Sequence, residues 1–80
     1  SIDIQTNRNG IPSTILKVVD NKVGINQASP NQALDIDGSL TLTGSIIITN
    51  NTASTNLNNG SLRTAGGAAI SKNLMLYLLA

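Results

Sequence analysis

The chain has 80 residues, with five Lys and Arg, four acidic residues that are all Asp, no His, no Cys and a single aromatic residue, Tyr77. Without an imidazole or a thiol, it has no Ser–His or Cys–His nucleophile pair, no thiolate metal site and no disulfide framework. A net charge of +1 and scattered cations provide no basic stripe for nucleic acid. We therefore expect a protein that is not an enzyme and has no cofactor, metal or nucleic-acid partner.

Aliphatic and small polar residues take the place of charge. Asn, Ser and Thr number 27, and Ile, Leu and Val number 23. Even complete burial of those aliphatic side chains in one copy falls short of the conformational entropy lost on ordering the chain. Short chains usually need an additional source of stability, and disulfides and thiolate metal sites are excluded here. The composition therefore predicts an oligomer.

The first half of the chain shows the period-two alternation of half-buried strands. Apolar and polar residues alternate over residues 2–5, 16–18 and 23–25. Asp20-Asn21 separates two of these segments and suits a two-residue turn, so we expect a hairpin over residues 18–25. Helix signals are poor throughout, with one helical turn expected near residues 26–32.

Two longer registers follow, in which apolar residues share even positions. The first runs over residues 34–48 and continues through two glycines, and the second occupies residues 62–78. A constant parity places these side chains on one buried face. The predicted oligomer core consists of Leu34, Ile36, Leu40, Leu42, Ile46, Ile48, Leu62, Ile70, Leu74 and Leu76.

These patterns predict an all-β chain of three segments. Residues 1–49 form a first β segment, residues 50–60 an Asn- and Thr-rich connector, and residues 61–80 a second β segment with an apolar end. That end, residues 74–80, is the longest apolar run and is far shorter than the ~20 residues of a membrane-spanning helix, so we expect no membrane insertion. No signal-peptide pattern occupies the first residues.

Asp35 and Asp37 are the one close pair of carboxylates. Their i, i+2 spacing on a strand projects both side chains from one face, where they could bind a cation or act on a sugar. A solvated strand face gives the same pattern. No aromatic residue lies near them to stack on a sugar ring, and the chain has no Glu to close an EF-hand loop.

Two segments carry a resemblance to a known family. Residues 21–40, N-K-V-G-I-N-Q-A-S-P-N-Q-A-L-D-I-D-G-S-L, resemble the N-x-V-G-I-G-T-x-S-P-x-x-x-L-D-V-x-G segment of the shafts of bacteriophage tail fibres and of fibre-like proteins of large algal viruses. Residues 59–74 are similar to the G-A-L-x-V-x-G-G-x-G-I-x-K-N-L motif of the same fibres. The chain departs from these patterns at Asn26 and Ala69, and has Met75-Leu76-Tyr77 after K-N-L, where V-G-G is usual.

The resemblance implies an elongated, intertwined homotrimeric β-fibre, of the triple-stranded β-helix or β-prism type, in which three chains share an apolar axis. It implies a structural role in a virion, with other virion proteins as partners and a host surface glycan or protein as receptor. It carries over no catalytic residue. The alternative is an extracellular filament subunit that polymerises by strand exchange through residues 74–80.

Overall fold

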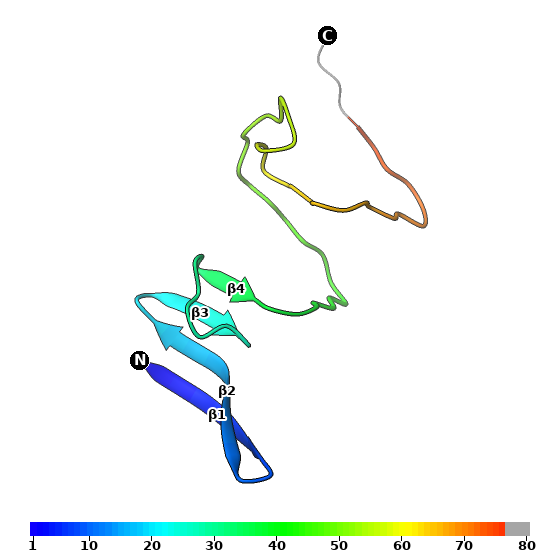
Figure 1. The fold of residues 1–80 in the computed structure, drawn as a ribbon. Coiled ribbons are helices and arrows are strands. Elements are labelled where there is room, and N and C mark those ends of the chain that lie inside the picture. The colour runs from blue at the N-terminus through cyan, green and yellow to red at the C-terminus, as the bar shows by residue number, and fades with distance from the viewer. Residues whose placement is uncertain (77–80) are drawn as a thin grey trace. The chain divides into compact units, whose positions relative to one another are not determined.

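The structure is a computed structural model that describes residues 1–76. It divides into two compact units, residues 1–44 and residues from 45 onward, and each is described by itself. The first unit is a single four-stranded sheet (Figure 1). Residues 1–76 contain no helix, and therefore none that is long and apolar enough to cross a membrane. The expected all-β class is confirmed. The strands are β1 (Ile2–Arg8), β2 (Ile11–Val19), β3 (Lys22–Ile25) and β4 (Leu34–Ile36).

The strands lie side by side in chain order. The β1–β2 and β2–β3 pairs are antiparallel, and β3 and β4 are parallel. Only Leu16–Val19 of β2 pair with β3, so the β1–β2 hairpin extends beyond the other two strands (Figure 1). A β-bulge lies within this hairpin, because Ile4 pairs with Leu16 while Gln5 pairs with Thr14.

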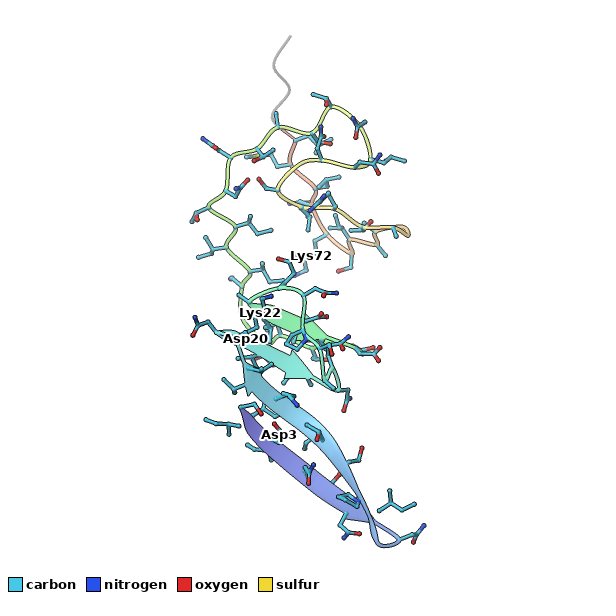
Figure 2. The ribbon with its side chains drawn as sticks, turned by 60° about the vertical axis from the view of Figure 1, so that its left-hand side comes forward. Asp3, Asp20, Lys22 and Lys72 are labelled. Atoms are coloured by element: carbon cyan, nitrogen blue, oxygen red, sulfur yellow. The ribbon has the colours of Figure 1, made fainter. Side chains whose placement is uncertain are left out.

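Two-residue turns with positive φ angles join the antiparallel strands. Asn9 and Gly10 have φ values of 54° and 78°, and Asp20 and Asn21 have values of 52° and 62°. Asn, Asp and Gly adopt this left-handed conformation most readily, and such turns match the twist of the flanking strands. The hairpin expected over residues 18–25 is confirmed. Figure 2 shows Asp20 and Lys22 at this turn.

Residues 26–33 form a tight loop that returns the chain to the start of β4, in parallel with β3. Gly24 and Pro30 are buried, and a Cβ atom added to Gly24 would overlap the backbone carbonyl oxygen of Gln27. The side chain of Asp35 accepts a hydrogen bond from the Asn31 N–H (2.9 Å). The helical turn expected near residues 26–32 is wrong, because these residues make successive bends around Gly24.

The second unit contains a closed polar loop. The Ser61 hydroxyl lies 2.6 Å from the carbonyl oxygen of Asn50 and 2.7 Å from its Oδ1, which brings the two ends of residues 50–61 together. Within the loop, Asn59 Oδ1 accepts a hydrogen bond from the Thr55 N–H (2.7 Å), and Asn56 Oδ1 accepts one from the Asn58 N–H (2.7 Å). Asn and Ser side chains thus replace a strand partner for this part of the backbone.

The described part of the chain after Ile36 forms no strand, although the sequence predicts strands in both registers. Leu40 to Ile48 keep an apolar parity, yet their backbone pairs with no other described residue. A strand exists only when a second strand satisfies its N–H and C=O groups. Residues 77–80 of the apolar end lie outside the described residues. The three-segment division at residues 49 and 60 stays a prediction.

The left-handed conformation of the β2–β3 turn predicts that Asn21→Val will lower the free energy of unfolding by about 1–2 kcal/mol, because a β-branched residue disfavours positive φ. Urea denaturation followed by circular dichroism measures this, at one fixed chain concentration because association shifts apparent stability. Asn21→Gly is the control and should leave stability unchanged or higher. Equal losses in both variants would contradict the turn geometry.

The close approach of Gln27 to Gly24 predicts that Gly24→Ala will destabilise the fold by about 1–3 kcal/mol, because the added methyl group meets backbone that must move. The same denaturation experiment measures it. Ser29→Ala, in the same loop, keeps the bond from the Ser29 N–H to Gln27 Oε1 (3.1 Å) and should change stability by less than about 0.5 kcal/mol. A neutral Gly24→Ala would show that the loop does not cross β3 this closely.

Candidate self-association site

The ten residues predicted to form an oligomer core are divided between the two units. Leu34 and Ile36 lie on β4, Leu40 and Leu42 follow in the first unit, and the other six belong to the second unit. Ile36 is half-buried, and the other nine are at least 45% exposed. No hydrophobic residue of the described chain is buried. Their common contact with other copies stays a prediction.

The strand register brings Leu34 and Ile36 together with six aliphatic residues from the other strands. Residues that pair directly across neighbouring strands project from the same face of a sheet. Two rows of four side chains therefore run across all four strands, and we call these eight residues the aliphatic face. One row is Ile2, Val18, Val23 and Leu34, and the other is Ile4, Leu16, Ile25 and Ile36.

The opposite face of the same strands carries charge. Asp3 pairs with Lys17, Lys17 with Gly24, and Gly24 with Asp35, which places these residues in one row. Lys17 Nζ lies 3.5 Å from Asp3 Oδ2, in an ion pair whose side chains are 24% and 32% exposed. Figure 2 labels Asp3 on β1. We call this side of the sheet the charged face.

The β-bulge lies where the aliphatic rows end on β1 and β2. It makes Ile15 the extra residue, so that Thr14 lies beside Gln5 instead of facing away from it, and Gln5 Nε2 donates to Thr14 Oγ1 (3.0 Å). Without the extra residue, the polar and apolar positions of β2 would exchange faces beyond this point. Thr6 lies on the same side of β1 as Ile4 and pairs with Ser13 beyond the bulge, so the two aliphatic rows end there.

Six members of the aliphatic face are not identified as parts of the site by the sequence alone. Alternation identified the residues of β1, β2 and β3 as half-buried, but only the pairing shows that they continue the rows of Leu34 and Ile36. The two-residue turns carry this information, because such a turn fixes which residues of its flanking strands are opposite.

Asp35 and Asp37 make different hydrogen bonds, the first through its side chain and the second through its backbone N–H. Asp35 holds the β3–β4 loop through the Asn31 N–H, whereas Asp37 lies after the end of β4 and donates its own N–H to the Ile25 carbonyl oxygen (3.0 Å). Among the described residues, no three His, Cys, Asp or Glu side chains are grouped so that they could hold a metal ion. The bond to Asn31 explains Asp35 without a ligand.

Comparison with known proteins gives no assignment: no protein-family model, no curated protein and no solved structure matches the chain.

The bond between Asp35 and the loop predicts that Asp35→Ala will lower the free energy of unfolding by about 1 kcal/mol. Asp35→Asn retains an acceptor oxygen and should lose less than half of that. Urea denaturation at fixed chain concentration compares the two variants. Equal destabilisation by Ala and Asn would show that the carboxylate acts through its charge, as a cation site requires.

Proposed function

We propose that the chain is a structural segment of a viral fibre, in which three copies form an elongated β-structure around a shared aliphatic axis. Its place is the virion, as part of a phage tail fibre or a comparable fibre, or otherwise an extracellular filament. Its work is mechanical: to hold a host-attachment end at a distance while remaining stiff and resistant to proteases.

The observation that carries this proposal is the lack of a buried hydrophobic core among residues 1–76, although their sequence is aliphatic and forms strands. Sixteen large hydrophobic residues are exposed among residues 1–76. A soluble chain does not leave so many aliphatic side chains in water, because contiguous exposed apolar surface mediates association or aggregation. Burial against further copies supplies what one copy lacks.

Residue chemistry supports a fibre over a globular oligomer. A narrow axis shared by three chains accommodates Ile and Leu, whereas large aromatic rings would hold the chains apart, and the chain has one aromatic residue. Asn, Ser and Thr on outward positions provide hydrogen bonds between strands. The order of the two fibre-like motifs, at residues 21–40 and 59–74, agrees with this arrangement.

The proposed role in attachment requires partners of three kinds. Copies of this chain form the shaft, other virion proteins hold it, and a glycan or protein on the host surface is the target of the assembled fibre. The proposed segment supports the receptor-binding end.

Sedimentation analysis and native mass spectrometry test the proposal on the 80-residue chain. We expect a discrete species of three times the 8.3 kDa chain mass that persists on dilution. A monomer with a cooperative unfolding transition would overturn the proposal, because it would show that one copy is sufficiently stable.

Deletion of residues 74–80 separates the fibre from its alternative. A trimeric shaft loses stability near its end but stays trimeric, whereas a filament built by strand exchange through this segment falls apart into soluble protomers. The discrete mass of the shortened chain decides between the two.

A further inference from the structure

The aliphatic face gathers eight aliphatic residues in two rows across the four strands of the first unit. Ile2, Ile4 and Leu34 are 63%, 50% and 56% exposed, and the other five residues are half-buried by their neighbours within the sheet. The more exposed residues lie on the outer strands β1 and β4, where one flank has no adjoining strand. None of the eight residues is fully buried within the first unit.

We propose that the aliphatic face packs against the same face of other copies of this chain. This inference rests on the proposed function, which requires self-association, and it assigns a specific surface to that contact. It extends the predicted oligomer core, which lies within residues 34–76, to residues of β1, β2 and β3.

The distribution of charge argues for identical partners. The two rows contain no charged or polar side chain, and the ion pair between Asp3 and Lys17 lies on the opposite face. A partner with charged side chains would find no counter-charge within the rows and would lose hydration without compensation. A second aliphatic face of the same kind is complementary, because stacked sheets pack through interdigitating apolar side chains.

The size of the face also favours copies of this chain. Strands about 4.8 Å apart and rows about 7 Å apart give the face an area of roughly 250 Å². A stable protein–protein interface covers about 800 Å² on each partner, so this face supplies only part of one. Association of identical chains supplies the rest, because symmetry then also brings together the exposed aliphatic residues that follow β4.

Single cysteine variants test the contact directly, since the chain contains no cysteine of its own. Val18 and Lys17 are neighbours on β2 and belong to the aliphatic face and the charged face, respectively. In Val18→Cys, a short bis-maleimide should link copies into covalent dimers in the native assembly. In Lys17→Cys, the matched control on the charged face, the thiol should react at least about tenfold faster with a monofunctional maleimide than the Val18→Cys thiol, because other copies cover only the aliphatic face in the proposed assembly.

The yield reports the number of copies around the axis. A reagent that joins two thiols leaves one chain of every trimer unlinked, so at most two of three chains enter covalent dimers, whereas a dimeric assembly is linked completely. Val23→Cys lies beside Val18 in the same row and should give the same result. It serves as the decisive variant if Val18→Cys loses the β-sheet circular dichroism of the parent chain.

Failure of this inference differs from failure of the proposed function. An oligomer in which the Val18→Cys thiol labels as fast as that of Lys17→Cys and forms no covalent dimer would overturn the assigned face and leave the fibre proposal standing. A folded monomer by native mass would overturn both. Cross-linking through Lys17→Cys alone would place the contact on the charged face and refute the inference.

Discussion

Burial of aliphatic side chains is the constraint on which the rest of this structure depends. A single sheet has two faces and can cover neither by itself, so stable domains place a second layer of structure on the apolar face. The first unit here is one layer. Each aliphatic side chain that another layer would bury contributes about 1.5–3 kcal/mol, so the eight residues of the aliphatic face represent a large share of the stability of a small domain. The stability of the fold therefore depends on which structure covers the aliphatic face.

Local backbone conformation determines which side chains form the aliphatic face. The left-handed turns at Asn9-Gly10 and Asp20-Asn21 fix the register of the meander, and Gly24 lets the following loop cross closely enough to bring β4 alongside β3. A slip of one residue in any of these pairings would move one strand's aliphatic side chains to the charged face. The turn residues thus determine, through the strand register, which side chains form the aliphatic face.

The sequence allowed some of this to be predicted, and the limits have physical causes. The hairpin over residues 18–25 was predictable because its turn residues and its alternation are both local signals. The parallel pairing of β3 with β4 was not predictable, because it depends on the close approach of Gln27 to Gly24. The loop over residues 26–33 makes bends, whereas the sequence predicts a helical turn there. Alternation also predicted strands over residues 40–48, where pairing depends on a partner that the described part of one chain does not contain.

The described residues after β4 differ in how far one copy satisfies their polar and apolar groups. The closed loop from Asn50 to Ser61 satisfies much of its backbone with its own Asn and Ser side chains, so it can remain in water without a strand partner. Residues 40–48 have alternating aliphatic side chains, and their backbone pairs with no other described residue. Water can satisfy those backbone groups but not the aliphatic side chains beside them, whereas strands from further copies would satisfy both. Residues 40–48 and the aliphatic face therefore both leave aliphatic side chains in contact with water in one copy, and packing against further copies would bury both.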